Sequence, residues 1–308
     1  MPDVQIALGL AAVGRPAYIN VGHGEDIVDS SVEGMELAAH AVLDAAYEGG
    51  VRWFDAARSY GRAEAFLASW LARRGLQPGD VTVSSKWGYR YTAGWRIDVA
   101  EHEVKDLSVE HFRTQWRETR ELLGDYLGLY QIHSATLDSG VLDDPAVRHE
   151  LDALRARGIR VGLTVTGVEQ AATIDRALAT GGFDAVQATW NLYERAAEAS
   201  LARAHEAGVR VLVKEALANG RLTERGGDET LAATARELGA SEDAVALAAA
   251  LARPWADVVL SGAATVAQLE SNLSALDLAW DDKLEQRLSG LVREPAAYWA
   301  ERAQLPWT

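Results

Sequence analysis

The sequence contains no cysteine among its 308 residues. This absence excludes disulfide bonds, thiolate metal sites, iron–sulfur clusters and cysteine nucleophiles. It also fits a reducing compartment, so we expect the protein to be cytoplasmic. No apolar run approaches the roughly 20 residues that a membrane-spanning helix needs. No secretory leader follows Met1-Pro2-Asp3, and we therefore expect no membrane partner.

Basic residues are scarce as well. The 30 lysine and arginine residues are outnumbered by 45 aspartate and glutamate residues, which gives a formal net charge of −15. A nucleic-acid-binding surface needs clustered basic residues, so we expect no nucleic-acid partner. Neither H-x-H nor H-E-x-x-H occurs, which argues against a metal hydrolase, and we assign no residue to a metal. Lysine occurs only at Lys86, Lys105, Lys214 and Lys283.

A sequence pattern typical of a helix that leads into a strand occurs three times in the chain. The segments LDAAYEGGVRWFD, LDALRARGIRVGL and LARAHEAGVRVLV each combine the last turns of an amphipathic helix, a glycine and a β-branched run. Further apolar runs have the composition of buried parallel strands. These runs lie at 6–13, 81–86, 127–133, 184–190 and 257–262. The sequence therefore predicts eight strands.

Helical periodicity fills the intervals between the predicted strands. The predicted helices are 33–48, 62–74, 109–123, 145–157, 168–180, 196–207, 229–253 in one or two pieces, and 266–276. The longest irregular segments are 14–30, 87–107 and the tail after 277. The tail is aromatic, and we expect it to pack against the rest of the protein. Eight alternations of strand and helix favour a closed (β/α)8 TIM barrel as a single domain over residues 1–308. A doubly wound sheet is the alternative, but no glycine-rich phosphate turn supports it.

Polar residues end three consecutive predicted strands. Asp55 ends the second, Lys86 the third and His133 the fourth, and Tyr60 follows Asp55 on the same loop. In a barrel these residues would converge on one face. Each also has a purely structural explanation: a loop cap for Asp55, a packing ring for Tyr60 and a core histidine for His133. An ammonium at Lys86 is costly to bury unless a carboxylate meets it, and Asp55 is on the next strand.

Together these residues suggest proton delivery by a phenol. A free tyrosine, with a pKa of about 10, is too weak an acid at neutral pH. An ammonium at about 4 Å favours phenolate by roughly 4 kcal/mol before desolvation, if the effective dielectric is about 20. We therefore expect Lys86, held by Asp55, to lower the pKa of Tyr60, while His133 polarises a substrate carbonyl. No protein nucleophile is placed there, so a hydride from a bound nicotinamide would complete the reaction.

The motifs FDAARSYG, SSKWG and LYQIHS resemble the aspartate, tyrosine, lysine and histidine motifs of the aldo-keto reductase family, in order and in spacing. The likeness extends over nearly the whole chain, from ALGLAAVGRP to SGAATVAQLESNL. It implies an enzyme that reduces a small-molecule aldehyde or ketone, with Tyr60 as general acid. It further implies Lys86 and Asp55 as the pair that tunes this acid, and His133 as the orienting group. The implied cofactor is NADPH, with NADH as the alternative.

The same resemblance assigns a cofactor site across the barrel mouth. Gln187 matches a contact to the nicotinamide amide. Leu217 and Gly220 match positions in a loop that wraps the pyrophosphate, and Gln268 and Asn272 match adenosine contacts. The remaining assigned residues are Ser134, Thr164, Gly262, Ala263 and Thr265. From the residues alone, 261–272 is a strand, a glycine turn and a helix start, which is either an anion site or simply a capped helix.

The sequence departs from the family pattern around the nicotinamide. Lys214 stands where many members have an aromatic residue that stacks on the ring. Because a cation beside an oxidised nicotinamide is unfavourable, we expect Lys214 to pair with Glu215 or to point elsewhere. Thr164 and Val165 replace a serine–asparagine pair, so the asparagine contact is missing.

A further departure affects the choice of cofactor. Residues 262–264 offer only backbone groups where many members meet the 2′-phosphate of NADPH with a basic residue or a serine. Thr265 and Gln268 remain as hydrogen-bond donors. We expect NADPH from the resemblance and keep NADH open.

Aromatic residues follow Lys86 in the loop that would overhang the mouth, and from them we assign Trp87, Tyr89 and Trp95 to substrate binding. They predict a pocket for aryl aldehydes, terpenoid ketones or the faces of sugars, unless they only pin a long loop. Two other functions stay open. Lys86 or Lys214 could form a Schiff base in a lyase, or the fold could bind nucleotide as a regulatory or sensor protein. No pattern indicates an oligomeric state.

Overall fold

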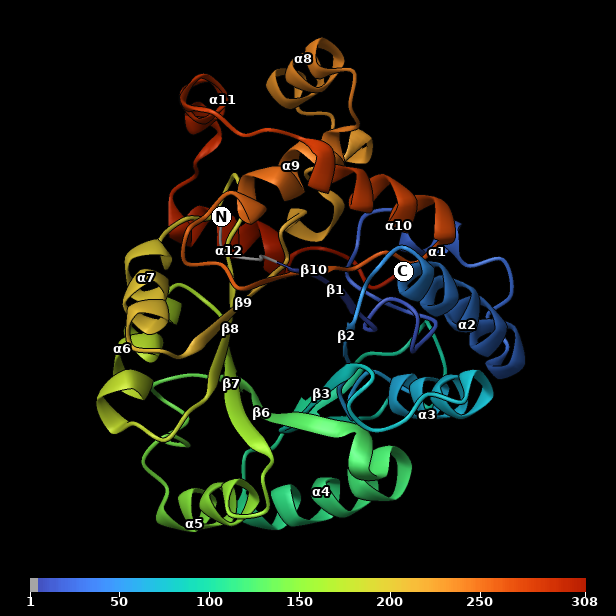
Figure 1. Ribbon diagram of the computed structural model, residues 1–308, viewed down its shortest axis with the longest axis vertical. Coiled ribbons are helices and arrows are strands. Elements are labelled where there is room, and N and C mark those ends of the chain that lie inside the picture. The colour runs from blue at the N-terminus through green and yellow to red at the C-terminus, as the bar shows by residue number, and fades with distance from the viewer. Residues whose placement is uncertain (1–4) are drawn as a thin grey trace.

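A computed structural model describes residues 5–308, and the sequence start Met1-Pro2-Asp3 lies outside the described residues. Eight parallel strands close into a barrel, and helices surround it (Figure 1). The strands are β1 (Gln5–Gly9), β2 (Trp53–Asp55), β3 (Thr82–Trp87), β6 (Leu127–Ala135), β7 (Arg160–Val165), β8 (Ala185–Thr189), β9 (Arg210–Lys214) and β10 (Val258–Ser261). Strand β1 pairs with both β10 and β2, which closes the ring. The predicted (β/α)8 barrel is confirmed.

The helices between the strands follow the predicted order. They are α2 (Val32–Glu48), α3 (Ala63–Arg74), α4 (Val109–Leu123), α5 (Pro145–Arg155), α6 (Gln170–Thr180), α7 (Glu198–Glu206), α8 (Glu229–Leu238), α9 (Glu242–Leu251) and α10 (Val266–Leu273). The segment predicted at 229–253 is two helices. Gly239 ends α8 in the left-handed region with a φ of 64°, and the Ser241 side chain then caps α9.

The segments that we expected to be irregular contain short elements. Residues 87–107 include an antiparallel hairpin of β4 (Tyr89–Tyr91) and β5 (Glu103–Lys105), and residues 14–30 include α1 (His23–Asp26). The tail forms α11 (Asp282–Leu288) and α12 (Pro295–Ala303). The 3-10 turns are η1 (Gly124–Tyr126), η2 (Ala218–Gly220), η3 (Glu224–Gly226), η4 (Ser274–Asp277) and η5 (Ser289–Leu291). Helices this short leave too few periods for an apolar pattern to be recognised.

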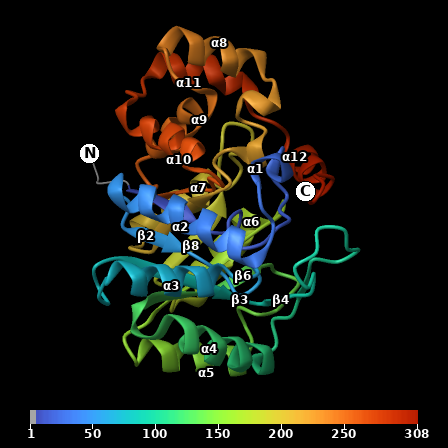
Figure 2. The ribbon, with the colours of Figure 1, turned by 90° about the vertical axis from the view of Figure 1, so that its right-hand side faces the viewer.

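The tail packs down as expected. Tyr298 on α12 is fully buried, and its hydroxyl accepts a hydrogen bond of 3.0 Å from Asn191 Nδ2. In the side view, α12 and the C-terminus lie on the same side of the molecule as α1 and the hairpin strand β4 (Figure 2). None of the helices within residues 5–308 combines the length and the apolarity that a bilayer crossing requires.

Two apolar layers hold the barrel. An inner cluster fills the barrel and includes Trp53, Leu129, Leu212 and Val258. The Trp53 indole donates to Ser84 Oγ at 2.9 Å, so its polar group is satisfied inside the core. A larger cluster lies between the strands and the surrounding helices. With both faces of each strand packed, the C-terminal strand ends form a rigid platform for side chains.

Helix α2 offers a matched test of this packing. Leu43 is fully buried against the barrel, whereas Leu37 on the same helix is 72% exposed. We expect Leu43→Ala to lower the free energy of unfolding by about 2–5 kcal/mol, since it removes buried methyl groups and leaves a cavity. Leu37→Ala should change it by no more than about 0.5 kcal/mol. Urea denaturation of both variants checks this, and equal shifts would contradict the assigned packing.

Candidate active site

An ion pair lies at the centre of the barrel mouth. Lys86 Nζ donates to Asp55 Oδ2 at 2.5 Å and to the Ala56 carbonyl at 2.8 Å. The two residues are only 1% and 2% exposed. A buried ammonium needs such partners, because its desolvation cost is otherwise uncompensated. The structure thus brings these two predicted site residues together from neighbouring strands, β2 and β3.

Three further donors surround the Asp55 carboxylate. Ser84 Oγ donates to Oδ1 at 2.6 Å, and Gln131 Nε2 donates to the same oxygen at 3.2 Å. Gln187 Nε2 donates to Oδ2 at 3.3 Å. Gln187, which the resemblance assigned to the nicotinamide amide, lines the cavity, and its amide nitrogen donates to Asp55. The charge-assisted bonds fix the carboxylate, and through it the position of the lysine ammonium.

Tyr60 lies above this pair. Its hydroxyl is 3.5 Å from His133 Nε2, and Lys86 Nζ is 4.7 Å from the centre of its ring. Burial raises the pKa of Tyr60 well above its usual range, and the Asp55 charge adds to the rise despite the opposing charge of Arg15. The expected lowering by Lys86 is therefore wrong, because desolvation of a phenolate outweighs it and Asp55 offsets the ammonium. Tyr60 is protonated at neutral pH, which is the state that a proton donor requires.

His133 is neutral for the opposite reason. Burial lowers the pKa of its imidazole well below 6.5, and the positive charges of Lys86 and Lys214 lower it further. Nδ1 lies 3.4 Å from Ser59 Oγ. When Nδ1 accepts a hydrogen bond from this hydroxyl, the proton is on Nε2, which faces Tyr60. Two donors, a phenol and a neutral imidazole, then point at one place in the cavity.

Lys214 pairs with Glu215, which was one of its two expected outcomes. Its ammonium donates to Thr189 Oγ1 at 3.1 Å and lies 3.9 Å from Glu215 Oε1. Burial lowers the pKa of Lys214 to about 8, although Glu215 acts in the other direction. Burial also raises the pKa of Glu215, but Arg302 and Lys214 outweigh it and hold this pKa at about 2. Arg302 binds the Glu215 carboxylate through both Nε and Nη2.

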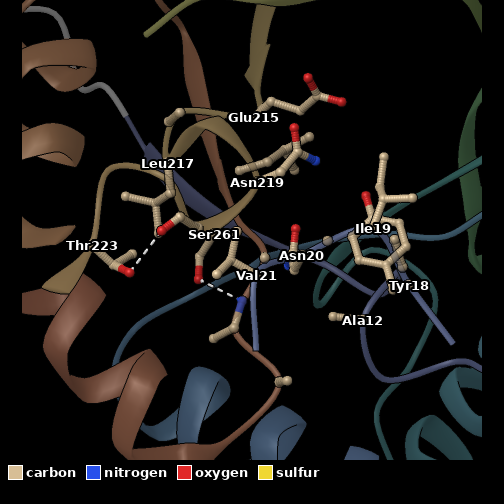
Figure 3. A pocket seen from close by; sticks show the side chains of 18 of the residues that line it. Ala12, Tyr18, Ile19, Asn20, Val21, Glu215, Leu217, Asn219, Thr223 and Ser261 are labelled. Carbon is tan, nitrogen blue, oxygen red and sulfur yellow. Dashed lines mark hydrogen bonds between the residues drawn. The ribbon is translucent and has the colours of Figure 1, made fainter. Parts of the chain in front are cut away.

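One cavity of about 770 Å³ is lined by Asp55, Tyr60, His133 and Lys214 and extends to the predicted cofactor site. Figure 3 shows part of its wall, with Leu217, Asn219 and Ser261. Most of the residues that the resemblance assigned to the cofactor line it, namely Ser134, Thr164, Gln187, Leu217, Gly220, Gly262, Ala263, Gln268 and Asn272. Thr265 is the exception. It is the N-cap of α10, where its hydroxyl accepts from Gln268 N at 3.2 Å, and it does not line the cavity.

The backbone around the cavity is strained. Ser134, Glu215 and Asn219 line it with φ values of 59°, 54° and 58°, a region that residues other than glycine rarely adopt. Such conformations persist where the surrounding structure imposes them, and they concentrate at functional sites. Gly220 follows with a φ of 85°, and a Cβ there would lie only 3.3 Å from Val21.

The cavity has features that fit an extended nucleotide. Asn219 Oδ1 is buried and has no partner within residues 5–308, so a ligand donor can satisfy it. Figure 3 shows Leu217, Asn219 and Ser261 around the same space as Asn20 and Val21. At the far end, Asp26 on α1 pairs with Arg225 at 2.6 Å and accepts from Gln268 Nε2 at 2.8 Å. These contacts join α1, η3 and α10 across the cavity.

Two of the three residues assigned to substrate binding lie elsewhere. Trp87 is fully buried and packs edge-on against Phe112 of α4, with ring centres 4.9 Å apart. The reason is that β3 continues through Trp87, so the residue after Lys86 faces the opposite side of the sheet. Trp95 donates from its indole to the Ser30 carbonyl at 2.8 Å, outside the cavity. Tyr89 does line the cavity, 4.9 Å from the His133 ring.

A search of family models matches residues 33–292 to the aldo/keto reductase family. The chain belongs to this family. Among solved structures, an aldo-keto reductase from Bacillus halodurans in its holo form is similar, with a TM-score of 0.71 at 20% identity over 95% of this chain and 94% of that chain. A Pseudomonas aeruginosa protein named as an aldo-keto reductase has a TM-score of 0.64 at 24% identity over 88% of each chain. At these identities the likeness supports the fold alone.

The sequence reasoning missed part of the wall of this aldo-keto reductase cavity. Arg15, Tyr18 and Glu103 line it from segments that we expected to be irregular, and Arg302 and Trp307 line it from the tail. No motif marks them. The one available signal was that 14–30 and 87–107 are long irregular segments, and residues of both line the cavity.

This aldo-keto reductase has only four lysines, so the pKa of Lys214 can be measured from its own side-chain signal. NMR of protein labelled only at lysine should show one side-chain signal that titrates with a midpoint of about 8. It should be ammonium below this pH and amine above it, because burial disfavours the charged form. The signal is assigned by its loss in Lys214→Arg. If the Lys214 signal remains that of an ammonium up to pH 9.5, the described burial is wrong.

Proposed function

We propose that this chain reduces a small-molecule aldehyde or ketone to an alcohol, with NADPH as cofactor and Tyr60 as general acid. The observation that carries the proposal is the convergence of the Tyr60 hydroxyl and His133 Nε2, 3.5 Å apart, above the buried Lys86–Asp55 pair. The resemblance of the motifs supports the same roles. We also propose that residues 1–308 form one domain, and that the protein is cytoplasmic.

The proposed roles follow from the charges at the mouth. A substrate carbonyl oxygen would accept hydrogen bonds from the Tyr60 hydroxyl and His133 Nε2. The proton of Tyr60 would then pass to this oxygen as negative charge develops on it. The phenolate left behind lies beside the Lys86 ammonium, 4.7 Å from the ring centre. Lys86 therefore stabilises charge that exists only as the reaction proceeds, which is the condition for lowering the barrier.

Bound NADPH would supply the hydride. Ser134, Thr164 and Gln187 would hold the carboxamide, and Leu217 and Gly220 would cover the pyrophosphate. Of the other assigned residues, Gly262, Ala263, Gln268 and Asn272 line the cavity and would hold the adenosine end.

That adenosine end contains charges of both signs. Arg236 lines it and has no ion-pair partner among residues 5–308, so it is a candidate for the 2′-phosphate of NADPH. Glu242 and Asp243 line the same wall and oppose a phosphate. Because the resemblance favours NADPH, we propose it over NADH, with Arg236 in place of the usual basic residue.

Two alternative functions, a Schiff-base lyase and a regulatory or sensor protein, can each be tested directly. Lys214 is buried in the cavity with a pKa of about 8, so a fraction of it is a nucleophilic amine at neutral pH and could form a Schiff base. Borohydride trapping of a carbonyl substrate on the protein would favour that lyase. A regulatory or sensor protein would bind nucleotide but show negligible steady-state rates with a panel of aldehydes and ketones.

If Tyr60 is the general acid, its loss should lower the rate of the chemical step and leave cofactor binding unchanged. We expect Tyr60→Phe to lower kcat by about a thousandfold, because the phenolic proton next to His133 Nε2 is lost. Cofactor affinity should stay within about twofold, since the ring remains. Steady-state rates and quenching of tryptophan fluorescence by NADPH measure the two quantities. Normal turnover by this variant would refute the assignment.

The cofactor proposal predicts saturable quenching by NADPH and weaker quenching by NADH. Arg236→Gln should weaken NADPH binding about tenfold, by loss of one charged contact of roughly 1.4 kcal/mol, and leave NADH within about twofold. Fluorescence titration of both proteins with both nucleotides gives the four dissociation constants. Equal or tighter binding of NADH by the unaltered chain would reverse the choice of cofactor.

A further inference from the structure

We propose that Lys214 sets the relative affinity of the protein for the two redox states of the nicotinamide, through an ammonium that repels the positive charge of the oxidised ring. The reduced ring is neutral and is not repelled. NADPH should therefore bind more tightly than NADP⁺ at neutral pH, and the difference should fall in alkaline solution, where Lys214 is uncharged. The inference rests on the proposed function, because it requires a nicotinamide beside Tyr60 and His133.

Lys214 has no carboxylate of its own. Three other cations around Tyr60 and His133 each have a carboxylate partner, in the pairs Lys86–Asp55, Arg15–Glu103 and Arg302–Glu215. The Lys214 ammonium lies 3.9 Å from Glu215 Oε1, but both oxygens of that carboxylate accept from Arg302 Nε, at 3.0 and 2.9 Å. Within residues 5–308, the ammonium makes one hydrogen bond, to Thr189 Oγ1 at 3.1 Å. Among these residues, one positive charge is therefore left without a matching carboxylate.

This charge acts on the space where the reaction would take place. Lys214, Tyr60 and His133 line the same cavity. Burial lowers the pKa of the His133 imidazole, and the positive charges of Lys86 and Lys214 lower it further. A hydride donor must reach the carbon of a carbonyl whose oxygen accepts from Tyr60 and His133, so charge on the donor ring develops in the same space. Buried charges are screened little, and Lys214 therefore acts on the ring as well.

Lys214 can lose its charge under mild conditions. Burial lowers its pKa to about 8, although Glu215 acts in the other direction, and the charges of Arg302 and Lys86 lower it further. Because burial disfavours the charged form, Lys214 is an ammonium below this pH and an amine above it. The repulsion of the oxidised ring is therefore present below the Lys214 midpoint and lost above it.

Four other titratable groups that line the cavity near Lys214 change charge outside this range. Burial raises the pKa of Tyr18 and that of Tyr60 above 10, and it lowers that of His133 well below 6.5. Burial also raises the pKa of Glu215, but Arg302 and Lys214 hold it at about 2. The Arg302 guanidinium stays charged throughout. A change in nucleotide binding near pH 8 therefore distinguishes Lys214 from these groups.

The oxidised and reduced cofactors differ in charge only at the nicotinamide ring. Contacts to the phosphates and the adenosine are common to both, so they cancel in the ratio of the two dissociation constants. The ratio therefore isolates the repulsion between Lys214 and the oxidised ring. By weakening the binding of the oxidised form, Lys214 would favour its release after each reduction, and the same factor would oppose hydride transfer in the bound state.

The test measures dissociation constants by isothermal titration calorimetry, at about 1.5 pH units below and above the Lys214 midpoint of about 8. NADP⁺ is compared with NADPH, and NAD⁺ with NADH, which makes the result independent of the choice between the two cofactors. We expect the ratio of the oxidised to the reduced dissociation constant to be about tenfold larger at the lower pH, which corresponds to about 1.4 kcal/mol.

Two variants fix the charge at this position in opposite states. Lys214→Met is uncharged at both pH values and should give the small ratio at both. Lys214→Arg stays protonated and should give the large ratio at both. Lys283→Met is the matched control, because Lys283 is an exposed residue of α11 that does not line the cavity. Its two ratios should stay within twofold of those of the unaltered protein.

The lysine NMR signal gives a reciprocal measurement on the unaltered protein. If the charge of Lys214 weakens the binding of NADP⁺, then bound NADP⁺ must lower the pKa of Lys214 by the same free energy. A tenfold effect on the ratio corresponds to a midpoint about one pH unit lower in the NADP⁺ complex than in the NADPH complex. This measurement requires no substitution in the cavity.

The outcomes separate this inference from the proposed function. If the nucleotides bind with the expected ratios but no carbonyl compound is reduced, the proposed function fails and the inference stands. If carbonyl compounds are reduced but the ratio is the same at both pH values, or is unchanged in Lys214→Met, the inference is overturned and the proposed function stands. Equal Lys214 midpoints in the two complexes would also overturn it. Failure of every nucleotide to bind would overturn both.

Discussion

The buried ion pair between Lys86 and Asp55 is the constraint on which the rest of the site depends. A buried ammonium in the mouth of a parallel barrel is stable only with a full set of partners. Asp55 on β2 and the Ala56 carbonyl accept from Lys86, and Gln131 on β6 and Gln187 on β8 donate in turn to Asp55. The ion pair can therefore form only when the barrel is closed and its strands are in the correct register. It also places a fixed positive charge under the Tyr60 ring, and the neutral His133 completes the donor set.

Charge at this mouth is balanced locally although the whole chain is strongly acidic. Lys86 is matched by Asp55, Arg15 by Glu103, and Arg302 by Glu215. Such pairing keeps cations in a cavity without attracting every anion in solution. The arrangement suits a reaction in which charge appears on one oxygen only for the duration of the transition state.

The sequence predicted the barrel and the four central residues because both leave local patterns: apolar runs that end in a polar residue, and short motifs around Asp55, Lys86 and His133. The expected direction of the pKa shift of Tyr60 was wrong. The expectation counted only the attraction between the Lys86 ammonium and a phenolate, and left out the cost of burying the phenolate. The sequence reasoning misplaced Trp87 because the end of β3 lies one residue beyond Lys86. Arg15 escaped notice because its partner Glu103 is 88 residues away and its neighbour Trp307 lies in the tail.

The last residues of the chain form part of the cavity wall. Thr308 exchanges two backbone hydrogen bonds with Tyr18, and Leu305 and Trp307 line the cavity. The barrel needs none of these residues to close. Substitutions at Leu305 or Trp307 can therefore reshape the pocket while the strand pairing that closes the barrel is kept, which gives evolution a route to altered specificity.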